Sequence, residues 1–291
     1  MERRREDTAR NLRPMVSTSL PFERYRSEIL RQTRLFRETL AGADPSAQVP
    51  SCPDWTLREL AVHLGGAHRW VHEIVRTRAQ EEVPDEAVPE FEGPPPKHEA
   101  AADAAALDEW LAEGAELLAG ALRDAGPEAR LWTWSEEQST VFWARRMTHE
   151  TVVHRADACL AAGQPYEVAP EVAADCVDEW LDIVCSPEAQ AYDEQLLQLR
   201  ERAGDSLHLH ATDTGGGEDG SGVRAEWLIE LGPDGPLWHR THGTATTALR
   251  GPLTDVLLVF YRRLAPDSDR VEVLGDPVLL DFWLERTSFG G

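Results

Sequence analysis

The feature that most restricts the fold is a helical pattern at residues 141–162, which carries ionisable groups on a mostly apolar face. At about 100° per residue, Glu150 and His154 fall on one side of this helix. The residues that share their sector are apolar or small: Trp143, Met147, Ala158 and Ala161. A buried carboxylate is costly unless it is paired or coordinates a metal ion. The helix must therefore pack against elements that complete the surroundings of Glu150.

The four-residue spacing of Glu150 and His154 has two interpretations. Side chains at this spacing lie one above the other on a helix, so the pair can bind one divalent metal ion. The same pair can instead form an intrahelical hydrogen bond at a helix–helix interface. A third candidate ligand, His63, lies in another helical segment upstream, which makes a metal site a testable hypothesis.

The first half of the chain contains four helical patterns, expected at residues 22–41, 56–78, 100–123 and 141–162. The second begins with a capping box from Thr56 to Glu59, and the fourth is followed by Gly163. Residues 42–54 and 82–99 are rich in proline and are expected to form loops. Four helices with one long crossover predict a four-helix bundle, a fold that builds metal sites from facing helices.

Three histidines of the second expected helix compete for the role of third ligand. His63 shares a sector with Leu60 and Ala67, at the edge of the stripe that faces the core. His68 and His72 form an i, i+4 pair of their own, but they project roughly 140° and 180° away from His63. All three therefore cannot serve one site.

The second half of the chain changes to a mixture of strands and helices. Helices are expected at 170–186, 252–264 and 277–284, and strands at 207–212, 225–231, 237–240, 244–249 and 271–274, with a hairpin loop at 215–222. This order predicts an α+β unit. His208 and His210 alternate with leucines on one strand face, and both are expected to face solvent and not to bind metal.

The composition restricts the class of protein. The chain has 291 residues, enough for two domains, and a net charge of −23. Because phosphates and anionic lipids attract basic surfaces, neither nucleic acid nor a membrane is an expected partner. No apolar run reaches about 18 residues, and residues 1–20 lack the apolar core of a secretory signal. We therefore expect a polar leader at 1–20 and a cytoplasmic protein.

None of the four cysteines forms a C-x-x-C pair, so a zinc ribbon is not indicated. In a cytoplasmic chain, we expect all four to be buried thiols: Cys52, Cys159, Cys176 and Cys185. Cys52 also precedes Pro53 at an expected helix entrance, where a helix N-terminus can lower the pKa of a thiol and make it reactive.

Two segments of the first half resemble signatures of the mycothiol-dependent maleylpyruvate isomerase family. They are residues 49–65 (VPSCPDWTLRELAVHLG) and 147–158 (MTHETVVHRADA). Residues 247–252 (TALRGP) and 271–276 (VEVLGD) are similar to the family's carboxy-terminal domain.

This resemblance implies a two-domain α+β protein. A DinB-like, metal-binding four-helix bundle would occupy residues 21–165, and a smaller α+β domain would occupy residues 166–291. A disordered leader at 1–20 would precede them.

The family binds a divalent metal, commonly zinc, through a His, a Glu and a His. Matched motif by motif, these ligands are His63, Glu150 and His154. The match favours His63 over the pair His68 and His72. Three protein ligands leave one coordination position open, as catalytic zinc sites do.

The resemblance also implies an enzyme that uses mycothiol, a low-molecular-weight thiol, on a small electrophile. A thiol that coordinates the metal loses its proton, and the thiolate then attacks the electrophile, either in S-transfer or in thiol-assisted isomerisation. Asp157, one turn beyond His154, would either orient this ligand or form a surface salt bridge. Arg262 and Arg263 either bind carboxylate or sugar oxygens through their planar donor forks, or end a solvated helix.

Two other functions fit the same three ligands. In a zinc-dependent hydrolase the metal would activate water. A non-catalytic metal-binding or stress protein would have the same fold and bind the metal without catalysing a reaction. The expected partners are a small-molecule thiol and an electrophilic substrate, and the expected assembly is a monomer or a homodimer.

Overall fold

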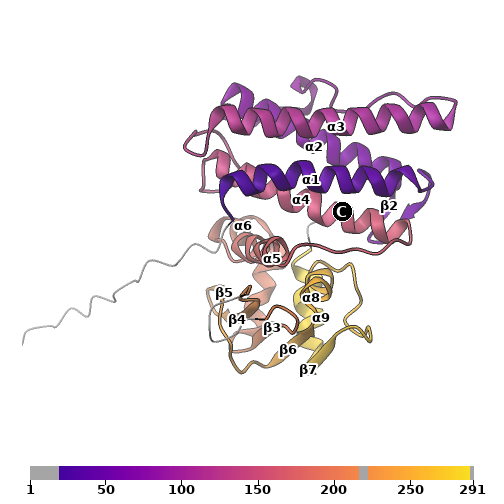
Figure 1. The fold of residues 1–291 in the computed structure, drawn as a ribbon. Helices are drawn as coiled ribbons and strands as arrows, with labels where there is room; N and C mark the ends of the chain where they lie inside the picture. The colour runs from indigo at the N-terminus through magenta and orange to yellow at the C-terminus, as the bar shows by residue number, and fades with distance from the viewer. Residues whose placement is uncertain (1–19, 216–221, 289–291) are drawn as a thin grey trace, which may run out of the picture.

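The computed structural model describes residues 20–215 and 222–288. All but the last residue of the leader expected at residues 1–20, and most of the hairpin loop expected at 215–222, lie outside these described residues. A helical unit is stacked on a unit that contains a five-stranded sheet (Figure 1). The predicted α+β fold with two parts is therefore confirmed.

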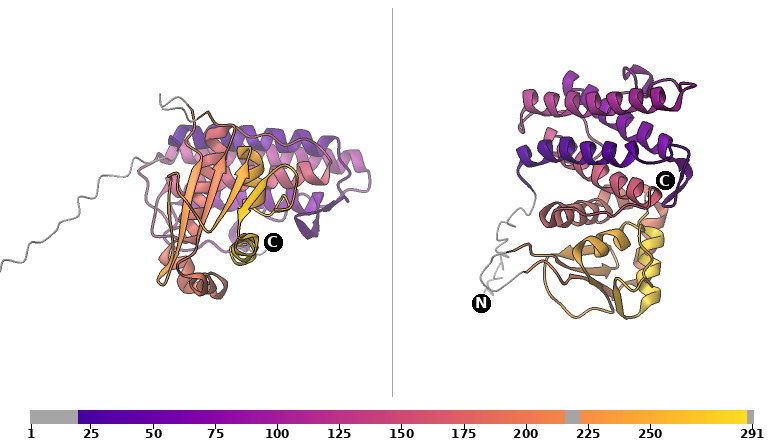
Figure 2. Two further views of the ribbon diagram at one scale, coloured as in Figure 1. Left: turned by 90° about the horizontal axis from the view of Figure 1, so that it is seen from below. Right: turned by 45° about the vertical axis from the view of Figure 1, so that its right-hand side comes forward.

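Four long helices form the predicted bundle. They are α1 (Phe22–Ala41), α2 (Leu57–Thr77), α3 (Ala100–Ala125) and α4 (Thr140–Ala161), and each lies within two residues of its expected range. Both α1 and α2 pack against α3 and α4, so the first two helices occupy opposite corners of the bundle. The right-hand view in Figure 2 shows these helices running side by side above the sheet unit.

The start of α2 follows the local signals in the sequence. The side chain of Thr56 accepts a hydrogen bond from the backbone N–H of Glu59. The carboxylate of Glu59 in turn accepts from the backbone N–H of Thr56 at 2.7 Å. This capping box fixes where α2 begins, and therefore the turn of the helix on which His63 stands.

A short hairpin replaces part of the loop expected at 42–54. Strands β1 (Gln48–Val49) and β2 (Cys52–Thr56) pair antiparallel, and β2 leads directly into α2. Cys52 therefore lies on a strand and not at a helix entrance. This position does not support the reactivity that a helix N-terminus could give its thiol.

Helix α4 is the most enclosed of the four. Seventeen of its 22 residues are buried, because α1 and α2 cover one side while the second half of the chain packs on another. Its polar side chains consequently face protein, and each of them needs a partner there. The enclosure of α4 agrees with the sequence, in which mostly apolar residues share the sector of Glu150 and must be covered by other elements.

Helix α5 (Pro170–Val184) lies between the bundle and the sheet (Figure 1). Short helical turns that the sequence did not predict follow it or interrupt the loops: η1 (Asp85–Ala87), α6 (Pro187–Tyr192), α7 (Glu194–Leu197) and η2 (Gln198–Arg202).

Five strands form one mixed sheet in the order β5–β4–β3–β6–β7. They are β3 (Ser206–Ala211), β4 (Glu226–Gly232), β5 (Gly235–His239), β6 (Thr247–Gly251) and β7 (Glu272–Gly275). Among the strand pairs that the described residues form in this sheet, only β3–β6 is parallel. The predicted helices of this half are present as α8 (Leu253–Phe260) and α9 (Pro277–Arg286), although α8 ends four residues earlier than expected.

One face of this sheet forms an apolar core with α5, α8 and α9. Leu207, Leu209 and Trp227 point into that core. His208 and His210 therefore lie on the opposite face, as strand alternation predicts. The expectation that both face solvent is wrong for His208, which is 5% exposed, because the segment between β5 and β6 crosses this face.

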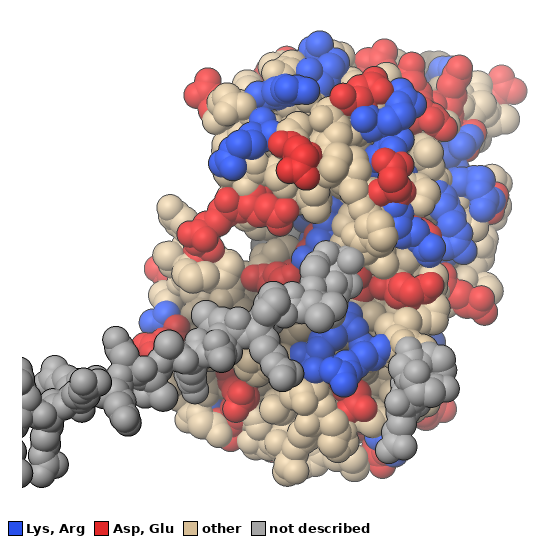
Figure 3. All heavy atoms as spheres, turned by 60° about the vertical axis from the view of Figure 1, so that its left-hand side comes forward, with Lys and Arg blue, Asp and Glu red and all other residues tan. Residues whose placement is uncertain are grey.

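Charged side chains of both signs are interspersed on the described part of the face drawn in Figure 3. Many arginines pair with a carboxylate on the same helix, such as Arg34 with Glu38 and Arg76 with Glu73. Positive charge is therefore balanced locally at these pairs. Among the described residues, no helix combines the length and the apolar character needed to cross a bilayer.

Candidate metal centre

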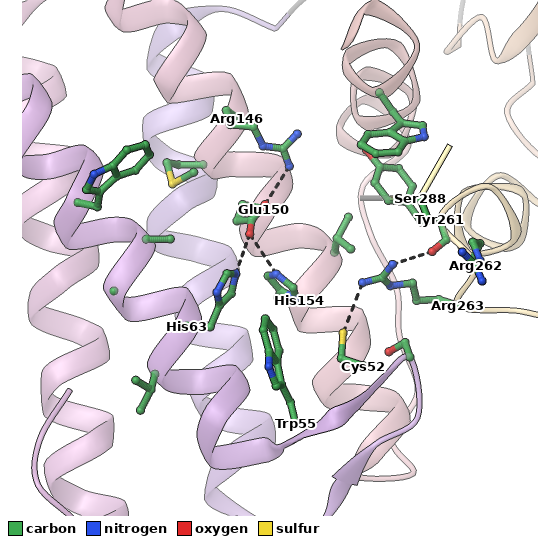
Figure 4. A pocket seen from close by; sticks show the side chains of 18 of the residues that line it. Cys52, Trp55, His63, Arg146, Glu150, His154, Tyr261, Arg262, Arg263 and Ser288 are labelled. Carbon is green, nitrogen blue, oxygen red and sulfur yellow. Dashed lines mark hydrogen bonds and ion pairs between the residues drawn. The ribbon is translucent and has the colours of Figure 1, made fainter. Parts of the chain in front are cut away.

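His63, Glu150 and His154 meet at one wall of a cavity (Figure 4). Oε1 of Glu150 lies 3.1 Å from Nε2 of His63 and 3.0 Å from Nε2 of His154. The three donor atoms all lie within 4.8 Å of one another. Two imidazole nitrogens and one carboxylate oxygen are ligand types that zinc accepts. The structure thus brings together the three residues that the sequence singled out.

Two packed helices and one hairpin position this group. Helix α2 presents His63, and α4 presents Glu150 and His154 one turn apart. Trp55 of β2 lies beside both histidines, with ring centroids 4.7 Å from His63 and 6.2 Å from His154. The hairpin that the sequence did not predict therefore supplies one side of the site.

The carboxylate of Glu150 is held in its ionised form. Burial alone would raise its pKa, but His154, His63 and Arg146 together lower the pKa well below its usual range. Nη2 of Arg146 donates to Oε2 of Glu150 at 3.1 Å, which leaves Oε1 directed at the two histidines. A metal ligand of this type must be deprotonated, and the surroundings of Glu150 favour that state.

Asp157 fixes the far side of the His154 ring. Nδ1 of His154 donates to Oδ2 of Asp157 at 2.9 Å, so Nε2 is the ring nitrogen turned toward Glu150. Burial lowers the pKa of His154, but Glu150 and Asp157 outweigh that effect and raise the pKa to about 9. Because Asp157 is completely buried, the alternative of a surface salt bridge is wrong.

The carboxylate of Asp157 has further donors from two distant segments. Burial alone would raise its pKa, but hydrogen bonds and charge from His154 and Arg263 lower the pKa below its usual range. Nε of Arg263 donates to Asp157 at 2.8 Å, and Oγ of Ser51 donates to it at 2.5 Å. Asp157 therefore links the candidate ligand His154 to the β1–β2 turn and to the end of α8.

The two rival histidines of α2 point elsewhere. Nε2 of His68 lies 2.9 Å from Oγ1 of Thr151 inside the bundle, where burial lowers the pKa of His68 to about 4. Nδ1 of His72 donates to the backbone carbonyl of Leu117 on α3 at 3.0 Å. Neither His68 nor His72 joins the group around Glu150, which agrees with the choice of His63.

The cavity beside the three residues has a volume of about 1150 Å³. The bundle contributes Trp55, Trp143 and Met147 to its lining, and the second half of the chain contributes residues 260–263 and 287–288. Small-molecule sites commonly form where two units meet, with a few polar groups in an apolar lining. The arrangement therefore suits a small-molecule substrate that contacts both halves.

The two arginines predicted at the end of α8 differ in their surroundings. Arg263 extends toward the bundle (Figure 4), donates to Asp157 through Nε and Nη2, and donates to the carbonyl of Tyr261 through Nη1 at 2.7 Å. Arg262 is an exposed residue of the cavity lining, and its backbone is left-handed, with φ of 63°. Such a conformation is uncommon for a residue with a Cβ atom. The guanidinium of Arg263 is thus paired with Asp157, whereas Arg262 lies at the rim of the cavity.

Sequence reasoning missed Arg146 as a member of the site. Its guanidinium pairs with Glu179 of α5 at 2.5 Å and with Glu150 at 3.1 Å. The four-residue spacing from Arg146 to Glu150 was the available signal, since such pairs meet on a helix.

Cys52 lines the same cavity. Burial and the neighbouring carboxylate of Asp157 raise the pKa of its thiol, which opposes the reactivity considered for it from the sequence.

Known proteins are similar to both halves of this chain. The family model of the mycothiol maleylpyruvate isomerase N-terminal domain matches residues 26–159, and that of the MDMPI C-terminal domain matches residues 171–282. A search of curated protein sequences finds no match.

Two solved structures share the fold. They are the mycothiol-dependent maleylpyruvate isomerase, with a TM-score of 0.54, and a histidine-to-alanine mutant of it, with a TM-score of 0.53. Each is 16% identical, and each alignment covers 88% of this chain and 93% of the other. Since the two family models together span the helical and the sheet-containing parts, this chain belongs to the mycothiol-dependent maleylpyruvate isomerase family.

Proposed function

We propose that this protein is an enzyme that uses mycothiol to isomerise a small electrophile. A bound divalent metal ion, which we take to be zinc, would assist the reaction. The observation that carries the proposal is the convergence of His63, Glu150 and His154 beside a cavity lined by both halves of the chain. Family membership and the isomerase of the same fold, solved as wild type and as a mutant, suggest the thiol and the reaction class. The enzyme would act in the cytoplasm as a monomer or a homodimer.

The residues present fit a divalent metal by the chemistry of their donors. Imidazole and carboxylate ligands suit zinc and its neighbours among the transition metals. His154 donates its other ring nitrogen to a buried carboxylate, as most metal-ligating histidines do. When bound by His63, Glu150 and His154, the ion would supply Lewis-acid stabilisation of a thiolate.

The protein's own side chains would have separate tasks in this reaction. Asp157 holds the ring of His154 in one orientation and is itself held by Arg263. Arg146 keeps Glu150 ionised and correctly turned. The second half of the chain lines the cavity opposite the bundle, and this would limit the access of water to the reacting groups.

The proposed isomerisation balances without a further reactant. The thiolate sulfur forms a bond to one carbon of a double bond conjugated with a carbonyl group, and the π electrons move toward the carbonyl oxygen. The remaining carbon–carbon single bond rotates. The electrons then return, the carbon–sulfur bond breaks, and the thiolate leaves the isomerised product. In the related S-transfer reaction the adduct would be protonated and released.

Turnover assays of the purified, zinc-reconstituted chain test this proposal. We expect conjugated carbonyl compounds to be isomerised when mycothiol is present and to remain unchanged without it, and we expect a chelator to remove the activity. Ester or amide cleavage without thiol would instead support a hydrolase. A reconstituted protein that converts none of these substrates would contradict the proposal.

Replacing Asp157 with asparagine is expected to weaken zinc affinity about 10- to 100-fold, because Asp157 orients His154 without being a ligand itself. Competition with a chromogenic chelator measures the dissociation constant. Ser51→Ala is the matched control, since it removes another hydrogen bond to the same carboxylate without touching His154. Equal affinities of wild type and Asp157→Asn would show that this hydrogen bond does not support metal binding.

Replacing Arg262 with alanine is expected to raise the KM for mycothiol or for an anionic electrophile about 10-fold with little change in kcat. The exposed guanidinium at the cavity rim can form a charge-assisted hydrogen bond to a carboxylate or sugar oxygen. Arg250→Ala is the control, since Arg250 is exposed on β6 and pairs with Glu272. Unchanged KM values for both substrates would exclude a binding role for Arg262.

A further inference from the structure

A second group of potential metal ligands lies on the sheet, far along the chain from the candidate metal centre. It consists of His208, His210, Glu226 and His242, which we call the outer-face cluster, and one donor atom from each lies within 4.8 Å of all the others. Oε2 of Glu226 lies 3.2 Å from Nε2 of His208, 3.4 Å from Nδ1 of His210 and 2.7 Å from Nδ1 of His242. Three imidazoles thus converge on one carboxylate oxygen.

Strand register brings three of these residues together. His208 and His210 are two residues apart on β3, so both project from the face opposite the apolar core. Glu226 pairs directly with His210 in the antiparallel β3–β4 ladder, and His208 is its diagonal neighbour. Their proximity is therefore a fixed property of the sheet.

The chain connection between β5 and β6 supplies the fourth residue. Two strands, β4 and β3, separate β5 from β6 in the sheet, so the connection at residues 240–246 must cross one face. The other face is covered by helices. The connection crosses the outer face, where Gly243 packs against Leu228 and His242 reaches Glu226.

The first residue of this connection, Arg240, is held by contacts outside the cluster. Arg240 donates to Asp178 of α5 through Nε at 2.9 Å and through Nη2 at 2.7 Å, and its guanidinium lies over the ring of Trp227. Trp227 donates to the same carboxylate at 2.7 Å. Arg240 therefore holds the chain two residues before His242, which keeps this exposed histidine within reach of the strands.

The distances from Glu226 to the three histidines are compatible with a tetrahedral ion. Ligand bonds of about 2.0–2.1 Å place neighbouring donors of a tetrahedral zinc site roughly 3.3 Å apart. Two of the three histidine–glutamate distances, 3.2 and 3.4 Å, are close to this value. Three imidazoles and one carboxylate also make four protein ligands, the number found in closed structural zinc sites.

We propose that the outer-face cluster is a second, structural site for a zinc-like divalent ion. An ion held by His208, His210, Glu226 and His242 ties the β5–β6 connection to β3 and β4 and so stabilises the sheet-containing half. The two sites share no residue, and the full set of four protein ligands distinguishes this one from the three-ligand candidate centre in the bundle. The inference does not depend on the proposed isomerase activity.

Zinc stoichiometry in a variant that lacks the bundle site tests this inference. In the full chain carrying His63→Ala and His154→Ala, we expect elemental analysis after exhaustive dialysis to find about one zinc ion per chain. Adding His242→Ala should remove that ion and abolish the zinc-dependent rise in the midpoint of thermal unfolding. The His242 side chain is 76% exposed, so its loss leaves the fold intact.

His239→Ala is the matched control, because His239 is exposed on β5, three residues before His242, and lies outside the cluster. In the same background it should retain the ion. Glu226→Gln provides a second test that should lose it. No zinc in the background variant, or equal zinc with and without His242, would overturn the inference. Failure of the bundle site alone would leave one ion in wild type and one in the background.

Discussion

Glu150→Gln is expected to eliminate stoichiometric zinc at the bundle site and to lower thiol-dependent turnover by about 10³-fold or more. The carboxylate oxygen of Glu150 lies between both imidazoles, within 3.1 Å of each. Glutamine has nearly the same shape but no charge, so it preserves packing while removing the anionic donor. Elemental analysis, which should find one zinc ion per chain fewer than in wild type, and steady-state assays on the same preparation measure both effects.

Glu73→Gln is the matched control for this change. Glu73 stands on α2, pairs with the exposed Arg76 and does not line the cavity. It should retain zinc and turnover. If Glu150→Gln loses turnover but keeps its zinc, Glu150 acts on the substrate and not as a ligand. If both zinc and turnover persist, the proposed centre is wrong.

Much of the helical half could be predicted because its signals are local. The capping box at Thr56 and Glu59 marks the start of α2, and Gly163 follows the end of α4. Helical periodicity likewise puts Glu150 and His154 on one face of α4. These features depend on residues only a few positions apart, so the sequence contains them directly.

The choice of His63 is a different case, because it depends on how α2 and α4 pack. Periodicity showed that His63, His68 and His72 point in different directions, but it could not say which direction faces α4. Family resemblance favoured His63, and the structure places it 3.1 Å from Glu150. Burial alone would select the fully buried His68 as the third ligand, and helical spacing alone would select the pair His68 and His72. Neither residue belongs to the group around Glu150.

The elements that were missed depend on tertiary contacts. Nothing local marks the two-residue strand β1, whose pairing with β2 brings Trp55 beside the histidines. Likewise, strand alternation puts His208 and His210 on the outer face of the sheet. That the β5–β6 connection crosses this face follows only from the strand order. Strand order is set by pairing across many residues, and His242 enters the cluster only through it.

A large loss of stability is expected when Asp175 is replaced by alanine. Asp175 of α5 is 1% exposed and accepts from the hydroxyl of Tyr25 at 2.7 Å and from Nε2 of His149 at 2.8 Å, while Arg145 lies 3.2 Å away. These partners come from α1 and α4, so one carboxylate joins the bundle to α5. Removing it leaves buried donors and charges without their partner, at a cost of about 3–5 kcal/mol.

Chemical denaturation measures this loss, and Asp182→Ala provides the comparison. Asp182 pairs with the same Arg145 at 2.7 Å, but its side chain is 48% exposed. Solvent screens such a pair, so its loss should cost no more than about 1 kcal/mol. Similar losses of unfolding free energy in both variants would show that the buried carboxylate of Asp175 stabilises the fold no more than the exposed carboxylate of Asp182 does.

The charge of Asp175 should also be visible in the pH dependence of stability. Burial alone would raise its pKa, but the hydrogen bond from His149 and the nearby charges lower the pKa to about 2 in the folded state. An unfolded aspartate titrates near pH 4, so the folded state binds its proton less readily. The resulting stabilisation is complete above about pH 4 and disappears as the pH falls through about 2.

Asp175→Asn isolates this contribution, because asparagine resembles the protonated aspartic acid. We expect the difference in unfolding free energy between wild type and Asp175→Asn to shrink between about pH 4 and pH 2, by about 2 kcal/mol in total. Titrations that do not depend on Asp175 cancel in this difference. The titration of His149, which is hydrogen-bonded to Asp175, does not cancel, so the comparison is confined to this acidic range. A difference that stayed constant down to pH 2 would show that Asp175 stabilises the junction through packing and hydrogen-bond geometry, with no contribution from its charge.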